Sequence, residues 1–211
     1  MTTLTAIIPT VATDLDRLAL LRRSVCSALH QCRDGDEIIV AGDITSDPLD
    51  HAREMCQRLG ADAPGGVAVR FVPFAGARHD YGHSQINHAL GVARGEWLTF
   101  QDDDDVYCAG AFDALREEIA RLPRPAPLLF RFRSHFGMTF WHTAGRVAQG
   151  HIGGHCLVTP NLPSLLGRWG ERYEGDYDFI RETLDRWARV GVEPVWVDRL
   201  IAIARPHEGA R

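Results

Sequence analysis

The first hundred residues of the chain alternate between short apolar runs and longer stretches whose apolar residues recur at helical spacing. The apolar runs span 4–8, 36–43, 67–74 and 96–100, and the helical stretches span 14–32, 49–60 and 84–95. Short apolar runs bounded by turn residues are typical of buried strands. Strands that alternate with helices form right-handed units in which the strands are parallel. The pattern therefore predicts an α/β fold built on a mostly parallel central sheet flanked by helices.

The order of elements changes in the second half of the chain. Residues 110–122 predict a helix, and the apolar stretches 128–134 and 138–143 predict two strands that pair antiparallel. Residues 152–166 have the composition of loops, residues 176–191 predict a helix, and residues 192–207 predict an extended segment. No repeat, low-complexity tract or linker separates the halves. We therefore expect one domain over 1–211, with a mixed second half from residue 106.

Composition narrows the functional class. The formal net charge of −5 argues against a protein that grips nucleic acid through a broad basic surface. Five scattered cysteines without a CxxC pair indicate reduced thiols rather than a disulfide framework or a zinc site. The N-terminus lacks the pattern of a signal peptide, and no apolar run approaches the ~18 residues of a membrane helix. We expect a cytoplasmic protein without a membrane span.

Four consecutive aspartates, Asp102–Asp105, follow the fourth predicted strand. In open α/β sheets, ligands bind outside the carboxyl ends of the strands. The other predicted ends are Pro9-Thr10, Gly42-Asp43 and 74–78. Clustered carboxylates repel each other, and a divalent cation removes that penalty. Oxygen ligands suit Mg²⁺ or Mn²⁺, and Mg²⁺ usually completes its shell with substrate phosphates. The sequence thus predicts a metal and a phosphorylated ligand at this edge.

Four consecutive aspartates are compatible with two structures other than a Mg²⁺ or Mn²⁺ site. They could form an ordinary polar turn in which Asp105 caps the helix near Ala109. A calcium loop of the EF-hand type fits poorly, because Tyr107 and Asp113 stand where that loop needs glycine and glutamate. The run of aspartates alone leaves the choice between a metal site and a polar turn open.

Five segments, in this order, resemble GT-A fold glycosyltransferases of the family 2 type: AIIPT (6–10), DEIIVAGDITSD (36–47), INHALGVARGEWLTFQDDDD (86–105), GGHCLVTPN (153–161) and GDYDFIRETL (175–184). The resemblance covers nearly the whole chain. It implies one GT-A (Rossmann-like) domain, with a nucleotide-sugar-binding half at 1–105 and an acceptor-binding half at 106–211. The implied activity is inverting, metal-dependent transfer of a sugar from a nucleotide-diphospho-sugar.

The resemblance also implies roles for individual residues. The general base would be Asp176, and Mn²⁺ or Mg²⁺ would lie on Asp102 and Asp104 of a DxD motif, with His207 as a late ligand. The implied nucleotide-sugar site comprises Pro9, Thr10, Asp43, Arg78, Asn87, Asp102, Asp103 and Asp104. The implied acceptor site comprises Gly154, His155, Trp169 and Asp178. Read from their residue type alone, Asp103 and Asp105 would be solvated or capping groups, and Trp169 would be a core residue.

The chain departs from the family pattern at three places. The DDGS motif reads Gly42-Asp43-Ile44-Thr45, so one acid of the nucleotide pocket is missing. The RN pair reads Ile86-Asn87, which removes an arginine that Arg78, His79 or His83 could replace. The ED pair reads Gly175-Asp176. These departures leave the identity of the donor open.

Two other functions were considered. A nucleotidyltransferase on a related sheet would need a phosphate loop rich in glycine and basic residues after the first strand, and PTVATDLD (9–16) contains neither. A non-catalytic nucleotide-sugar-binding module on the same scaffold is the other alternative. The acceptor is open among protein, glycan, lipid head group and modified nucleobase, and the oligomeric state is open as well.

Overall fold

The computed structural model of the protein describes residues 2–11, 14–43, 49–76 and 80–206. Its α-helices are α1 (Leu15–Leu29), α2 (Leu49–Ala61), α3 (His83–Leu90), α4 (Ala111–Arg121) and α5 (Gly175–Arg189), with short 3₁₀ turns η1 (Gly154–Cys156) and η2 (Pro163–Leu165). Its strands are β1 (Leu4–Thr10), β2 (Glu37–Asp43), β3 (Ala68–Phe74), β4 (Trp97–Phe100), β5 (Val106–Tyr107), β6 (Leu128–Arg133), β7 (Thr139–Phe140), β8 (Leu157–Pro160) and β9 (Val195–Ile203).

All of these strands belong to one sheet, in the order β3-β2-β1-β4-β8-β6-β9-β5, with β7 attached to β6. The pairs among β3, β2, β1 and β4 are parallel, as the alternating pattern predicts. Beyond β4 the sheet is mixed, because β8 pairs antiparallel with both β4 and β6. The predicted α/β class is confirmed, and the sheet runs through both predicted halves of the chain.

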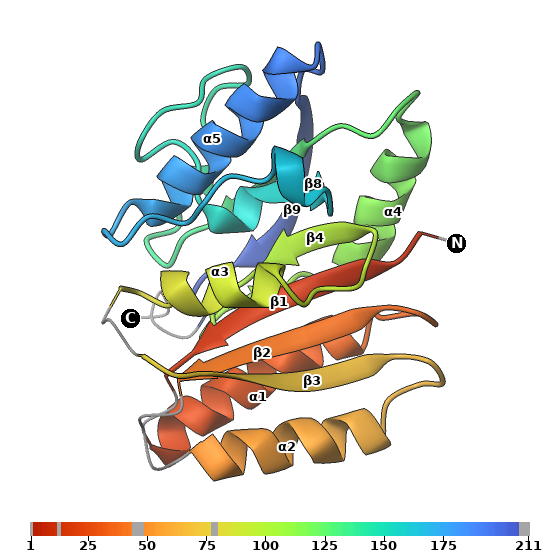
Figure 1. Cartoon of the computed structure of the whole chain (residues 1–211), viewed down its shortest axis with the longest axis vertical. Helices are drawn as coiled ribbons and strands as arrows, with labels where there is room; N and C mark the ends of the chain where they lie inside the picture. The colour runs from red at the N-terminus through yellow and green to blue at the C-terminus, as the bar shows by residue number, and fades with distance from the viewer. Residues whose placement is uncertain (1, 12–13, 44–48, 77–79, 207–211) are drawn as a thin grey trace.

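Helices cover both faces of the sheet (Figure 1). One core contains Ile8 and Val40 together with apolar residues of α1, α2 and α4. The other contains Ile7 and Ile39 together with residues of α3 and α5. Neighbouring residues of a strand point to opposite faces. Since both faces are covered, every position of β1 is buried, and this explains why its sequence is mostly apolar rather than alternating.

A buried carboxylate fixes the start of β1 against the loop before β2. Asp36 accepts hydrogen bonds from the backbone N–H groups of Leu4 (2.9 Å) and Arg33 (2.7 Å). The guanidinium of Arg116, which comes from α4, forms an ion pair with the same carboxylate. The charge of Asp36 is therefore satisfied inside the protein, as a buried charge requires.

Most predicted elements match the structure, with two differences. The antiparallel pairing predicted for 128–134 and 138–143 is confirmed by β6 and β7. However, α3 ends at Leu90 rather than near residue 95, and residues 157–160, read as loop, form the central strand β8. Within the described ranges, none of the helices has the length and apolar character needed to cross a bilayer.

Candidate functional site

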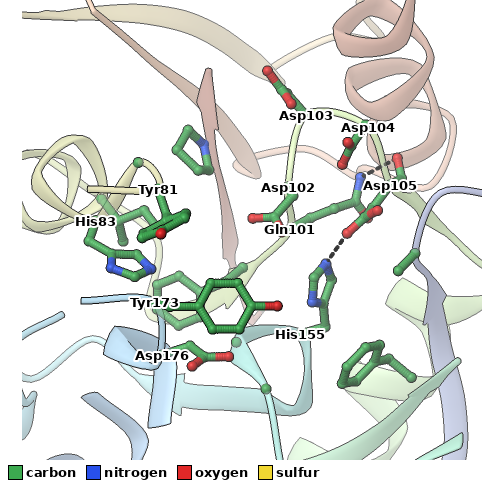
Figure 2. Close-up of a pocket in the computed structure, with 18 of the residues that line it drawn as sticks. Tyr81, His83, Gln101, Asp102, Asp103, Asp104, Asp105, His155, Tyr173 and Asp176 are labelled. Carbon is green, nitrogen blue, oxygen red and sulfur yellow. Dashed lines mark hydrogen bonds and ion pairs between the residues drawn. The ribbon is translucent and has the colours of Figure 1, made fainter. Parts of the chain in front are cut away.

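A cavity of about 990 Å³ opens where β1 and β4 end, and Figure 2 shows a selection of the side chains that line it. Ile7 of β1 pairs with Phe100 of β4 in parallel register. Thr10 and Asp103 each lie three residues further along the chain, so they are level with each other at the cavity wall. On the other side of β4, Val158 of β8 pairs antiparallel with Thr99, so the turn η1 that precedes β8 lies beside the same end of β4. The sheet thus places residues distant in sequence around one cavity.

Asp103 is held by β1 and by the first turn of α1. Its Oδ2 accepts a hydrogen bond from the Thr10 hydroxyl at 2.6 Å, and its Oδ1 lies 2.5 Å from Nη2 of Arg17. Burial raises the pKa of Asp103, while the Thr10 hydroxyl and Arg17 act in the opposite direction. The side chain is 4% exposed, so the reading of Asp103 as a solvated acid is wrong.

Asp104 lies between two arginines from opposite ends of the chain. Its Oδ2 is 3.2 Å from Nη1 of Arg17 and 3.2 Å from Nε of Arg205, which follows β9. The backbone carbonyl of Asp104 accepts a hydrogen bond from Arg23 of α1 at 2.6 Å. The Asp104 carboxylate is therefore engaged by internal cations.

Asp105 pairs with His155 of η1, at 2.5 Å between Oδ2 and Nε2 (Figure 2). Burial alone would lower the pKa of His155, but Asp105 outweighs it and raises the pKa to about 9. Conversely, burial would raise the pKa of Asp105, and the imidazolium lowers it. The reading of Asp105 as a solvated or helix-capping group is wrong, because it is buried and because Gly110 is the residue that caps α4.

Asp102 is the member of the run whose side chain is open to the cavity. The surrounding protein removes part of its hydration and raises the pKa of Asp102 to about 7, although His155 acts in the opposite direction. One ligand atom each from Asp102, Asp105 and His155 lie within 4.8 Å of one another. Two carboxylates and an imidazole suit a divalent cation such as Mn²⁺.

Asp176 reaches the cavity from the first turn of α5. Its carboxylate accepts hydrogen bonds from the backbone N–H groups of Tyr177, at 2.6 Å, and Gly154. Burial raises the pKa of Asp176, with these hydrogen bonds acting in the opposite direction. Glycines surround it closely: a Cβ on Gly175 would lie 2.2 Å from the Gly170 carbonyl oxygen, and one on Gly153 would lie 3.4 Å from Oδ2 of Asp176. The position of Asp176 depends on these small residues.

Three other predicted site residues have different surroundings. Trp169 lines the cavity but is only 4% exposed, and its ring stacks on Phe179 at 5.0 Å. Asn87 is not among the described residues that line the cavity; its amide exchanges two hydrogen bonds with the backbone of Trp169. Asp178 is likewise absent from the cavity wall and forms a bidentate ion pair with Arg172.

The structure thus gathers most of the predicted residues and leaves others undescribed. The predicted residues that line the cavity are Pro9, Thr10, Asp102, Asp103, Asp104, Gly154, His155, Trp169 and Asp176. Arg78, His79 and His207 lie outside the described residues, and so does the side chain of Asp43, whose backbone ends β2. Their roles stay predictions.

Arg17 had no role in the sequence-based predictions, which also did not include the contact that His83 makes. Arg17 neutralises Asp103 and Asp104. It lies in the first turn of the helix that follows the first strand, and this position at the ligand-binding edge of the sheet could have identified it from the sequence. His83 begins α3, and its Nδ1 lies 2.7 Å from the Gly170 carbonyl oxygen, so it donates its proton to the loop before α5. No spacing within the sequence indicates the contact between His83 and the Gly170 carbonyl.

The fold and the carboxylate-lined cavity define a GT-A type protein. Residues 5–155 match the model of glycosyl transferase family 2, and the chain belongs to that family. No curated protein sequence matches the chain.

Solved structures show the same fold at low sequence identity. TarS of S. aureus superposes with a TM-score of 0.70 at 14% identity, over 97% of this chain and 36% of that one. A shorter TarS chain, residues 1–349 in complex with UDP-GlcNAc, gives 0.64 at 13% identity over 97% and 58%. The mannosyltransferase PcManGT from Pyrobaculum calidifontis, in complex with GDP-Man and Mn²⁺, gives 0.62 at 14% identity over 96% and 56%. The chain therefore spans between about a third and three fifths of these proteins.

Proposed function

We propose that the chain is an inverting glycosyltransferase that moves a sugar from a nucleotide-diphospho-sugar to an acceptor hydroxyl and depends on Mn²⁺ or Mg²⁺. The observation that carries the proposal is one cavity in which the carboxylates after β4 and the half-buried Asp176 of α5 both lie. Membership of family 2 supports glycosyl transfer. The complexes of TarS with UDP-GlcNAc and of PcManGT with GDP-Man and Mn²⁺ support the donor class and the metal.

The donor would lie at the end of β1 and β4. Thr10 and Asp103 form a rigid hydrogen-bonded pair suited to the nucleoside. The metal would lie on Asp102, Asp105 and His155, whose ligand atoms are close enough to share one ion. Once bound, such an ion supplies Lewis-acid stabilisation of the departing diphosphate. His155 needs to lose its proton for this role, so metal binding would release a proton.

Asp104 is the ligand that the family resemblance implies, in place of Asp105 and His155. Its carboxylate is engaged by Arg17 and Arg205, so an ion there would displace at least one arginine. A displaced arginine would then be available to the donor diphosphate, for which guanidinium groups are suited. Both ligand sets share Asp102. In one set the ion also lies on Asp105 and His155, and in the other it lies on Asp104.

Asp176 would act as the general base. Burial raises its pKa, which makes the carboxylate a stronger base near neutral pH. The acceptor hydroxyl gives its proton to Asp176 while its oxygen forms a bond to the anomeric carbon. The bond between that carbon and the diphosphate oxygen breaks, and the electron pair leaves with the nucleoside diphosphate. Attack opposite the leaving group inverts the configuration.

The test of the base compares two neighbouring aspartates of α5. Asp176→Asn should abolish transfer and donor hydrolysis across a panel of UDP- and GDP-sugars, while UDP or GDP with Mn²⁺ still raises the melting temperature. Asp178→Asn is the matched control, because its carboxylate pairs with Arg172 away from the cavity. Full turnover by Asp176→Asn would refute the role of the base. Nucleotide binding without any turnover by the wild type would favour a non-catalytic module.

A metal titration separates the two ligand sets. The increase in melting temperature on adding Mn²⁺ should vanish in Asp102→Asn under either arrangement. If the ion lies on Asp105 and His155, the increase also vanishes in Asp105→Asn and persists in Asp104→Asn. The opposite pattern would assign the ion to Asp104. An Mn²⁺ response that persists in Asp102→Asn would contradict both.

A further inference from the structure

Exposed aromatic side chains gather at the mouth of the cavity. Tyr81, Phe136 and Tyr173 are 63%, 75% and 73% exposed, and they are the exposed large aromatic residues of the described part of the chain. All three line the cavity. Exposed apolar surface that is concentrated at one pocket marks a binding site rather than the scatter expected on a protein surface.

Two of these residues form a pair beside the proposed base. The rings of Tyr81 and Tyr173 are 5.3 Å apart and nearly perpendicular, at 78°. Tyr173 lies three residues before Asp176, and Tyr81 comes two residues before His83, whose Nδ1 bonds to the Gly170 carbonyl. That hydrogen bond ties the two tyrosine-bearing loops together. In Figure 2, Tyr81, Tyr173 and Asp176 lie away from Asp103 and Asp104. With the donor at Asp103, as proposed above, the tyrosines lie on the side where the acceptor would bind.

The backbone of Tyr81 is strained. Its φ angle is +62°, in the left-handed region that a residue with a Cβ adopts only at a cost in stability. The side chain is mostly exposed, so packing inside the protein recovers little of that cost. Strain of this kind persists where a side chain has to be presented in a particular direction, and it concentrates at functional sites.

The charges around the pair restrict the ligand. The acids Glu174 and Asp176 line the cavity and follow Tyr173 by one and three residues. Glu174 accepts a hydrogen bond from Gln149 at 2.8 Å. The nearby cation Arg172 is engaged by Asp178 through two hydrogen bonds of 2.7 Å. A phosphorylated or carboxylated acceptor would therefore meet carboxylates of like charge. Carboxylate oxygens instead accept hydrogen bonds from hydroxyl groups.

We propose that Tyr81 and Tyr173 form an acceptor subsite for a neutral pyranose ring of a glycan. The C–H face of a pyranose is apolar and packs on the electron-rich face of a phenol ring. Its hydroxyl groups point outward from the ring edge, where Glu174 and Asp176 accept their hydrogen bonds. One of those hydroxyls is the nucleophile. This inference rests on the proposed glycosyl transfer and adds the chemical class of the acceptor to it.

Saturation-transfer NMR on the whole chain tests the subsite without knowledge of the natural acceptor. The probes are methyl α- and β-pyranosides of glucose, galactose and mannose, with glucuronic acid and glucose 6-phosphate as anionic comparators, in the presence of UDP or GDP and Mn²⁺. Neutral pyranosides should show contact at their ring C–H protons, and the anionic sugars should show none. Tyr173→Ala and Tyr81→Ala should weaken binding about tenfold, and Tyr173→Phe should keep it within about threefold.

Leu15→Ala is the matched control, because Leu15 is as exposed as Tyr173, at 73%, but is not among the described cavity-lining residues. It should bind the pyranosides like the wild type. The inference is overturned if no neutral pyranoside binds, if anionic sugars bind equally well, or if binding survives both tyrosine-to-alanine changes. If UDP and GDP with Mn²⁺ fail to raise the melting temperature of the wild type, the proposed function fails instead.

Discussion

Stability should fall as the pH rises above neutrality, because of His155. The ion pair with Asp105 raises the pKa of this buried imidazole from 6.5 to about 9. Between these values the folded state holds a proton that the unfolded state has released, so the stability it brings is complete below pH 6.5 and is lost as the pH passes 9. At about 1.4 kcal/mol per pH unit, the whole contribution is about 3 kcal/mol, and about 2 kcal/mol of it disappears between pH 7 and pH 9.

Most of the stability that His155 contributes is lost between pH 7 and pH 9. The raised pKa of Asp102, about 7, acts in the same direction but below this range. Burial also raises the pKa of the thiols of Cys32, Cys56 and Cys156 to about 12, so these groups begin to lower stability near pH 9, where the thiols of the unfolded chain ionise. For a chain of this size, about 2 kcal/mol corresponds to roughly 4–8 °C in melting temperature.

The assay is thermal unfolding across this pH range with a chelator present. The wild type should lose roughly 4–8 °C from pH 7 to pH 9. His155→Gln should melt lower at pH 7 and lose most of that slope, because no titrating group then pairs with Asp105 and the buried thiols contribute only near pH 9. His51→Gln, at an exposed position of α2, should keep the wild-type slope. Equal slopes in the wild type and His155→Gln would refute the reasoning.

Three further changes have distinct expected outcomes. Gly175→Ala should destabilise the protein and abolish transfer, because the added Cβ would lie 2.2 Å from a backbone oxygen. Gly65→Ala, at a position with open space around it, should change neither the melting temperature nor the turnover, which are the two quantities to measure. Asp36→Ala should cost about 3–5 kcal/mol in urea unfolding, because it leaves Arg116 buried without its partner, and a loss below about 1 kcal/mol would contradict this. Tyr81→Gly should melt no lower than Tyr81→Ala, because glycine accepts the positive φ, and a clearly lower melting temperature would show that the backbone there is not strained.

The sequence predicted the parallel half of the sheet better than the rest, for a physical reason. β1 and β2 are buried on both faces, so their apolar runs are unbroken and easy to recognise. β8 was not predicted as a strand, because LVTP is only four residues long and lies between glycine- and proline-containing turns. Its pairing with β4 depends on residues some sixty positions apart, as Thr99 and Val158 show, and no local pattern carries that information.

The candidate site, like the sheet, could be predicted only in part from the sequence. The rule that ligands bind at strand ends predicted the position of Asp102–Asp105. The surroundings of each carboxylate could not be predicted, because they depend on partners from other elements. Asp105 meets His155 only because β8 is inserted beside β4, and Asp104 meets Arg205 only because β9 returns to the same edge. Asn87, inside α3, bonds to the backbone of Trp169 instead of lining the cavity.

The antiparallel strand β8 makes the site sensitive to insertions and deletions within β8 and tolerant of them in the segment before η1. A single-residue deletion within 157–160 would turn each following side chain of the strand to the opposite face of the sheet. His155, which enters the strand through η1, would lose its alignment with Asp105. Length changes in the exposed stretch 142–146 can be absorbed without moving β8. Family members with this chemistry are therefore expected to vary in the segment before η1 and to keep a constant number of residues from η1 to the end of β8.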